Sequence, residues 1–111
     1  MVDVVNNILD DSKAEKINIV DLHHKTSIAD YFVIATCRST RHANAIADEL
    51  IKKLKKIGIM CPNPEGRPKC DWVIVDAGSV VIHLFRSEIR ELYNLEKLWS
   101  MSFDLVENKL A

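Results

Sequence analysis

The sequence has few cysteines, and their spacing fits neither a disulfide framework nor a zinc site. The three cysteines stand at positions 37, 61 and 70, and no two of them form a C-x-x-C pair. His23 and His24 are adjacent, so on a strand they would point to opposite faces. An odd cysteine count without paired spacing indicates a reducing compartment, and the four-ligand spacings of structural zinc are missing. We therefore expect no metal ion and no other cofactor.

Long hydrophobic runs are also missing. No apolar stretch approaches the roughly 20 residues that are needed to cross a bilayer. The N-terminus opens with Asp3 rather than with a basic segment followed by an apolar one. We therefore expect a cytoplasmic protein without a membrane partner.

An excess of one charge is the third feature that the sequence lacks. Its 15 basic and 16 acidic residues give a formal net charge of -1. A balanced chain loses the long-range attraction on which a generic polyanion binder depends. Any contact with RNA must therefore be local.

Common phosphate-binding and metalloprotease motifs are absent as well. The sequence has no G-x-x-x-x-G-K-[ST] loop, no G-x-G-x-x-G turn and no H-E-x-x-H pair. The composition that remains, 48% hydrophobic and 28% charged over 111 residues, is typical of one globular domain. We therefore expect a single domain over residues 1–111.

Hydrophobic periodicity in the first third predicts a short helix and then two strands. The helix is indicated by Val2, Val5, Ile8 and Leu9, and the first strand by Ile17, Ile19 and Leu22, with Asn18 on its other side. Residues 31–36 form a continuous apolar run, which is typical of a strand covered on both faces. This run should be a central strand of the sheet.

The clearest predicted helix runs from about Thr40 to Ile57. Ser39 or Thr40 is placed to cap its start, and Gly58 to end it. Its apolar positions follow a 3,1,3,1,3,3 spacing through Ala43, Ile46, Ala47, Leu50, Ile51, Leu54 and Ile57. Lysines at positions 52, 53, 55 and 56 either complement the helix dipole as a solvated helix end or form a patch that binds RNA.

The second half of the chain predicts an irregular loop and a hairpin. Residues 60–69 contain three prolines and one glycine and should form the loop. Residues 72–76 and 80–85 read as two strands, with Gly78 able to take the positive φ of a tight turn. The resulting order of elements predicts an α/β domain with a mixed β-sheet flanked by helices.

The end of the chain carries more apolar surface than one helix stripe needs. If residues 87–99 were one helix, the apolar residues between Ile89 and Trp99 would cover more than half of its circumference, whereas an ordinary stripe is about 100° wide. Either the helix breaks near Asn94 and both pieces pack in the core, or part of this surface docks on another molecule.

Several single residues have a structural and a functional interpretation. Trp72 either closes the end of the core or lies on an open sheet face as an interface anchor. His83 is either a partly buried structural histidine or a partner contact. Arg38 and Arg41 flank a helix N-terminus, where they either pair locally or attract a phosphate. Cys37 is interpreted as a small packed thiol.

A set of blocks in fixed order resembles the ribosomal silencing factor family, also called the Iojap-related family. The blocks are residues 30–36 (DYFVIAT), 39–42 (STRH) leading into 45–48 (AIAD), 72–76 (WVIVD), 81–83 (VIH) and 90–99 (RELYNLEKLW). The sequence departs from the family pattern at Cys37, where glycine is more common, and at Ser79, where an acidic residue is common.

The resemblance implies a nucleotidyltransferase-like fold, but the sequence lacks the catalytic pair of that scaffold. Nucleotidyl transfer there uses carboxylates two residues apart on one strand, which hold metal ions. None of the 16 acidic residues has another at i+2, and fold likeness cannot supply missing chemistry. We therefore expect no enzymatic activity. The alternative is a degenerate nucleotide-binding enzyme that uses Ser39, Arg41 and Asp76.

The resemblance also implies a partner. The family binds the large ribosomal subunit through large-subunit ribosomal protein fourteen and sterically prevents subunit joining when nutrients are scarce, and its members form homodimers. A further alternative is an assembly factor of the large subunit. The residues expected to bind the partner are Trp72, His83, Arg90, Tyr93, Leu95, Glu96 and Trp99.

Overall fold

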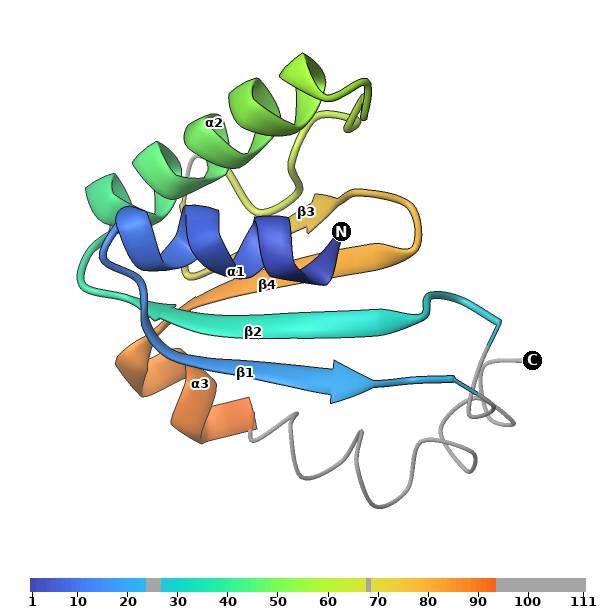
Figure 1. Ribbon diagram of the computed structural model, residues 1–111. Helices are drawn as coiled ribbons and strands as arrows, with labels where there is room; N and C mark the ends of the chain where they lie inside the picture. The colour runs from blue at the N-terminus through green and yellow to red at the C-terminus, as the bar shows by residue number, and fades with distance from the viewer. Residues whose placement is uncertain (24–26, 68, 94–111) are drawn as a thin grey trace.

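Seven elements make up the part of the chain that the computed structural model describes, residues 1–23, 27–67 and 69–93 (Figure 1). They are α1 (Val2–Asp11), β1 (Glu15–Asp21), β2 (Tyr31–Cys37), α2 (Thr40–Lys56), β3 (Trp72–Asp76), β4 (Val80–Arg86) and α3 (Ser87–Tyr93). None of the described helices is both long enough and apolar enough to span a bilayer.

The four strands form one mixed sheet in the order β1-β2-β4-β3. β1 and β2 are antiparallel, as are β3 and β4, whereas β2 and β4 are parallel. Parallel neighbours need a crossover connection, which α2 supplies. The prediction of a mixed sheet flanked by helices is confirmed, and β2 is a central strand as expected.

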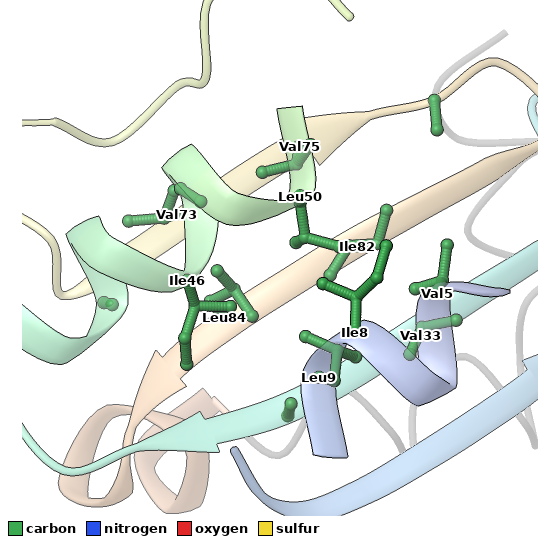
Figure 2. Packing of buried hydrophobic residues seen from close by; sticks show 14 of the residues in the cluster. Val5, Ile8, Leu9, Val33, Ile46, Leu50, Val73, Val75, Ile82 and Leu84 are labelled. Carbon is green, nitrogen blue, oxygen red and sulfur yellow. The ribbon is translucent and has the colours of Figure 1, made fainter. Parts of the chain in front are cut away.

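α1 and α2 lie side by side on one face of the sheet, which we call the first face (Figure 1). Strand alternation sends every second side chain of β2, β3 and β4 to this face. In Figure 2 Ile46 and Leu50 of α2 lie over the β3 and β4 side chains, and the α1 residues lie over Val33. The buried cluster includes Val5, Ile8, Leu9, Val33, Ile46, Leu50, Val73, Val75, Ile82 and Leu84.

The opposite side of the sheet, the second face, carries a smaller cluster. α3 lies on this side, where Ile89 packs against the cluster (Figure 1). Its buried members are Val20, Leu22, Ala29, Phe32, Ile34 and Phe85, with Trp72 and Val81 partly buried beside them. Both faces of β2 are therefore covered with apolar side chains, which explains its continuous hydrophobic run.

Both ends of α2 are capped as predicted. The Ser39 hydroxyl accepts a hydrogen bond from the backbone N–H of His42 at 3.0 Å. At the other end Gly58 has φ +88, its N–H bonds to the Lys55 carbonyl, and the Ile59 N–H bonds to the Leu54 carbonyl. This pair of bonds is a Schellman motif, in which a left-handed residue satisfies the last carbonyls of the helix.

The β3–β4 connection is the predicted tight hairpin. Gly78 has φ +85, and its N–H donates to the Asp76 carboxylate at 2.8 Å. The Ala77 N–H donates to the Val80 carbonyl at 2.9 Å. The expected loop before β3 is irregular apart from an isolated bridge between Glu65 and Ile74, which covers part of the outer edge of β3.

The prediction of a strand through Ile17 and Ile19 is confirmed as β1, but its apolar side chains do not share one environment. Ile19 is 41% exposed, and the buried side chains are Val20 and Leu22 on the second face. The pairing register shifts between Glu15 and Asn18, and Lys16 lies in this irregular stretch with φ +49. A bulge of this kind bends an edge strand and re-aims its side chains, so alternation alone does not give the burial of each residue in β1.

The prediction about surplus apolar surface falls largely outside the described residues. α3 is described up to Tyr93, so neither a break near Asn94 nor the packing of residues 94–99 is tested.

Candidate partner-binding surface

Trp72 is the aromatic centre of the second face. It is the cross-strand partner of Phe85 in the β3–β4 ladder, and the two rings are stacked with centroids 5.0 Å apart and planes 26° apart. The indole Nε1–H donates to His83 Nδ1 at 3.1 Å. The side chain is only partly buried. A tryptophan held in this way presents a rigid aromatic surface with little entropy left to lose on binding.

His83 supports Trp72 from within the cluster. It is 5% exposed, and its ring makes an edge contact with Phe32 at a centroid distance of 4.8 Å. Burial lowers the pKa of His83 to about 4, so the ring is neutral at neutral pH. A neutral ring whose Nδ1 accepts from Trp72 carries its proton on Nε2. His83 therefore fixes the orientation of the indole.

Two hollows flank the Trp72–His83 pair. One, of about 380 Å³, is lined by Gly66, Arg67, Lys69, Asp71, Trp72 and Ile89. The other, of about 340 Å³, is lined by Ile28, Phe32, Pro62, Asn63, Glu65, Ile74, Asp76, Val81 and His83. Each is lined by both apolar and charged residues, a combination that suits the surface of a protein partner.

A chain of ion pairs borders Trp72. The Asp71 carboxylate lies 2.9 Å from Arg86 Nε and 3.8 Å from Lys69 Nζ. Arg86 Nη2 lies 3.8 Å from the Glu88 carboxylate. Partly exposed charges of this kind direct the approach and register of a partner more than they add affinity.

Arg90 lies between α3 and the sheet. Its Nη1 donates to the Lys16 carbonyl at 2.7 Å and to the Thr36 hydroxyl at 2.8 Å. The Lys16 carbonyl belongs to the irregular stretch of β1, so Arg90 joins α3 to two strands. The sequence analysis expects Arg90 to bind the partner, and in the structure its side chain holds α3 against the sheet.

Four of the predicted partner contacts are undescribed. Tyr93 is the last described residue of α3 and is placed by its backbone alone. Leu95, Glu96 and Trp99 lie outside the described residues. The structure therefore brings Trp72 and His83 together on the second face and leaves the role of these four residues as a prediction.

A comparison with family models decides the family. Residues 1–110 match the model described as ribosomal silencing factor during starvation. The chain belongs to this family. It is 46% identical over 96 residues to the ribosomal silencing factor RsfS of Zymomonas mobilis, covering 86% of this chain and 72% of that one. It is 38% identical over 100 residues to the RsfS of Haemophilus influenzae, covering 90% and 98%.

A mouse protein is a further relative of this chain. It is named mitochondrial assembly of ribosomal large subunit protein 1 and is 38% identical over 109 residues, covering 93% of this chain and 47% of its own length.

Solved structures share the fold. A crystal structure of a Chromobacterium violaceum protein has a TM-score of 0.85 at 33% identity and covers 89% of this chain and 82% of its own. A Bacillus halodurans structure has a TM-score of 0.79 at 37% identity, covering 88% and 91%.

Arg38 and Ser39, two of the residues proposed for phosphate binding at the start of α2, are engaged in local contacts, whereas Arg41 is exposed. The Ser39 hydroxyl caps the helix, and Arg38 Nε pairs with the Glu15 carboxylate at 3.2 Å. His42 accepts from the Arg38 N–H at Nδ1 and lies 2.8 Å from the Ser12 carbonyl at Nε2. These contacts tie the end of α1 to the start of α2. Sequence reasoning missed His42, because the contact with Ser12 spans 30 residues.

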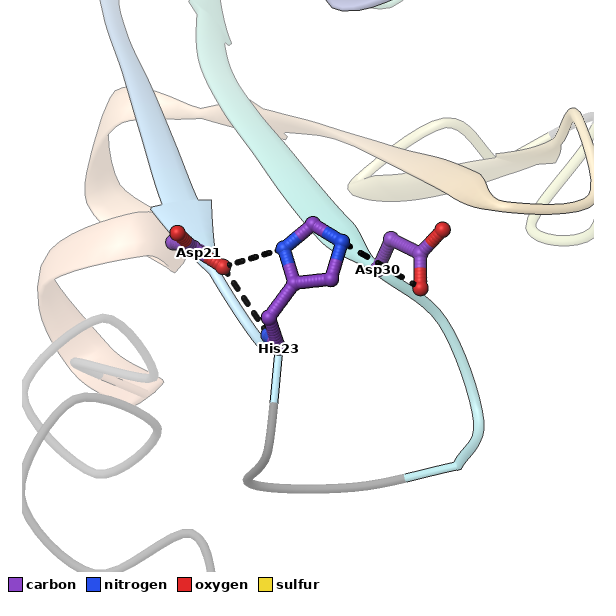
Figure 3. Close-up of polar contacts among 3 residues, drawn as sticks. All are labelled: Asp21, His23 and Asp30. Atoms are coloured by element: carbon purple, nitrogen blue, oxygen red, sulfur yellow. Dashed lines mark hydrogen bonds and ion pairs between the residues drawn. The ribbon is translucent and has the colours of Figure 1, made fainter.

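A second polar cluster holds the connection between β1 and β2 (Figure 3). His23 Nδ1 lies 2.8 Å from the Asp21 carboxylate, and His23 Nε2 lies 3.6 Å from that of Asp30. The His23 ring also meets the Tyr31 ring edge-on at a centroid distance of 4.9 Å. In the part of the chain that is described, no three His, Cys, Asp or Glu side chains are grouped to hold a metal ion.

The interpretation of Cys37 as a packed thiol is confirmed. Its side chain is 2% exposed within the first-face cluster. Burial, with a smaller contribution from Cys70, raises the pKa of Cys37 to about 12. The thiol therefore stays protonated and is a poor nucleophile.

Proposed function

We propose that this protein is a cytoplasmic translational repressor that binds the large ribosomal subunit through large-subunit ribosomal protein fourteen and blocks joining of the small subunit when nutrients are limiting. Membership of the ribosomal silencing factor family supports the ribosomal partner. The observation that carries the proposal for the docking site is the partly exposed Trp72, stacked on Phe85 and oriented by His83.

Occlusion needs no chemistry from the protein. A specific interface buries about 800 Å² on each partner, an area that a domain of 111 residues can provide on one face. The rest of the body then occupies space that the incoming subunit needs. In this mechanism Trp72 is the anchor, while His83 and Arg90 act from within the fold by holding Trp72 and α3 in place.

Co-sedimentation with purified large subunits tests the docking face. We expect Trp72→Ala to weaken binding by at least roughly 30-fold, the effect of losing a central aromatic anchor. Trp72→Phe retains a ring that can stack on Phe85 but loses the bond to His83, so its binding should be intermediate.

Val4→Ala is the matched control, since Val4 is an exposed apolar residue on α1, on the opposite side of the sheet. Circular dichroism confirms that each variant folds. Equal binding by wild type and a folded Trp72→Ala variant would remove Trp72 from the docking site. Absence of binding by the wild type would overturn the proposed function.

The name of the mouse relative favours a second candidate, assembly of the large subunit. An assembly factor should sediment with immature particles and not with finished large subunits. A repressor should bind finished subunits and lower the yield of complete ribosomes when small subunits are added.

Self-association through the same face is part of the proposal. An isologous dimer would pair the Trp72 surface of two copies and shield it when no ribosome is available. Analytical ultracentrifugation should then show a dimer that Trp72→Ala weakens and Val4→Ala leaves intact.

A further inference from the structure

The last turns of α2 concentrate positive charge on a chain that is otherwise balanced. Four of the five residues 52–56 are lysines, and the fifth, Leu54, is fully buried. At 100° per residue the lysines cover about 160° of the helix circumference, centred opposite the core positions. Lys52, Lys55 and Lys56 are exposed, so this end of α2 is a compact basic surface, which we call the lysine end.

Few acidic groups offset this charge. Among the described residues, Glu49 is the one carboxylate that pairs with a lysine of the cluster, at 3.6 Å from Lys53 Nζ. Asp48 stands four residues before Lys52, but its carboxylate lies 2.7 Å from Arg67 Nη1 instead. Lys52, Lys55 and Lys56 therefore keep their charge toward solvent.

Folding alone does not account for this arrangement. Positive charge in a last turn complements the helix dipole, but three pairs of these lysines are three or four residues apart and repel one another. Those pairs are 52 with 55, 52 with 56 and 53 with 56. The Schellman motif at Gly58 already satisfies the last carbonyls of the helix. A bound polyanion would turn this repulsion into attraction.

The lysine end lies on the first-face side of the sheet, away from Trp72. The buried residues of α2 pack against Val73 and Val75, whereas Trp72 and Ile74 point to the other side by strand alternation. Figure 1 shows α2 and α3 on opposite sides of the sheet. The lysines and Trp72 therefore contact different surfaces of any large assembly.

We propose that the lysine end of α2 is a second binding site, which takes the phosphate backbone of an RNA. This inference rests on the proposed function, since a protein that docks on a ribosomal subunit through Trp72 is surrounded by RNA. The overall charge of -1 excludes strong steering toward any polyanion. The contact is therefore local: at physiological salt it forms once docking has brought RNA close, and at low salt it also binds free RNA weakly.

The test compares a lysine variant with a charge-matched control. The variant is Lys52→Gln, Lys55→Gln and Lys56→Gln together. The control, Lys13→Glu together with Lys16→Gln, removes the same three units of net charge at two exposed side chains elsewhere. Glutamine is a good helix former, so the lysine variant should fold. Its thermal midpoint should not fall, whereas a fall would favour the dipole explanation.

Binding is measured first with a fluorescent RNA hairpin at about 20 mM salt. We expect the wild type and the control to bind and the lysine variant to lose at least roughly tenfold in affinity. Sedimentation with large subunits over a salt series follows. Each lost phosphate contact should make the negative slope of log K against log salt shallower by about 0.7 to 0.9. The slope of the variant, which loses three contacts, should therefore be shallower by about 2 to 3.

The two proposals fail separately. Suppose that the wild type binds large subunits, but that the lysine variant has the same hairpin affinity and the same salt slope as the wild type. The lysine site is then overturned and the silencing proposal stands. If the wild type does not bind large subunits, but binds the hairpin and loses this binding in the lysine variant, the proposed function is overturned and the lysine site stands. Equal losses in variant and control would reduce the effect to net charge and overturn the site.

An anionic membrane is the competing partner, because Ile57 and Met60 beside the lysines are 55% and 72% exposed. Vesicles containing phosphatidylserine test it with the same proteins. Vesicle binding that depends on the lysines, without hairpin binding, would overturn the RNA assignment.

Discussion

His83 shows how one buried side chain links the stability of the fold to the candidate interface. Its ring contacts Phe32 and accepts a hydrogen bond from Trp72. Protonation at Nδ1 would remove that acceptor and place a charge in an apolar cluster. The orientation of Trp72 therefore depends on a neutral histidine.

Acid should destabilise the protein through His83. The pKa of His83 is about 4 in the folded protein, below its ordinary value of 6.5, so the unfolded chain binds more protons between these values. The contribution of His83 to the free energy of unfolding is fully present above pH 6.5. It decreases as the pH drops toward 4, by roughly 3 kcal/mol. Urea unfolding at a series of pH values measures the loss.

The control for this prediction separates His83 from the exposed histidines. His83→Asn offers an oxygen to Trp72 without titrating, so its unfolding free energy should depend less on pH in this window. An unchanged pH dependence in the His83→Asn protein would contradict the prediction.

Among the elements, α2 illustrates how local chemistry sets the length of a helix and the direction in which it presents its charges. Ser39 begins it and Gly58 ends it. The cap at Gly58 places the four lysines in the final turns and keeps Ile57 and Met60 at the surface. A change at the cap should therefore alter both the stability of the protein and the placement of the lysines.

Gly58→Ala should lower the free energy of unfolding by about 1 kcal/mol, because φ +88 is unfavourable for a residue with a Cβ. No atom of the rest of the fold lies within 4 Å of the position where that Cβ would stand, so the cost comes from the local backbone conformation and not from a tertiary clash. Gly58→Asn is the matched variant, since asparagine tolerates the left-handed region better. Urea unfolding should rank glycine first, asparagine second and alanine last, and equal stability of all three would contradict the assignment.

At the scale of the molecule, the sheet separates two surfaces with different chemistry. Trp72 and its ion-pair border lie on the second face, and the lysine end lies beyond the first face. Because none of the four lysines lines the hollows beside Trp72, the two surfaces should contribute independently to binding.

We therefore expect additivity in large-subunit binding. The loss in binding free energy for a protein carrying Trp72→Ala and the three lysine substitutions should equal the sum of the separate losses to within about 0.5 kcal/mol. Sedimentation at moderate salt, where the single variants still bind measurably, provides the comparison. A combined loss no larger than the loss from Trp72→Ala alone would mean that the lysines act only through the Trp72 surface.

The sequence by itself determined most of the local structure. Apolar spacing predicted α2 to within one residue at its C-terminal end, and Gly78 predicted the hairpin between β3 and β4. These features depend on residues within one or two turns of each other, where propensity, capping and periodicity act. Ordered blocks of residues likewise identified the family, which the family model confirmed.

Only the tertiary structure decided which residues meet. Trp72 and His83 lie 11 positions apart and join because β3 and β4 pair in that register. Arg90 reaches the Lys16 carbonyl across 74 positions, through a bulge that no alternation pattern reveals. Strand order and pairing register depend on packing the whole core at once, so local periodicity shows which side chains are buried but not which partner each of them finds.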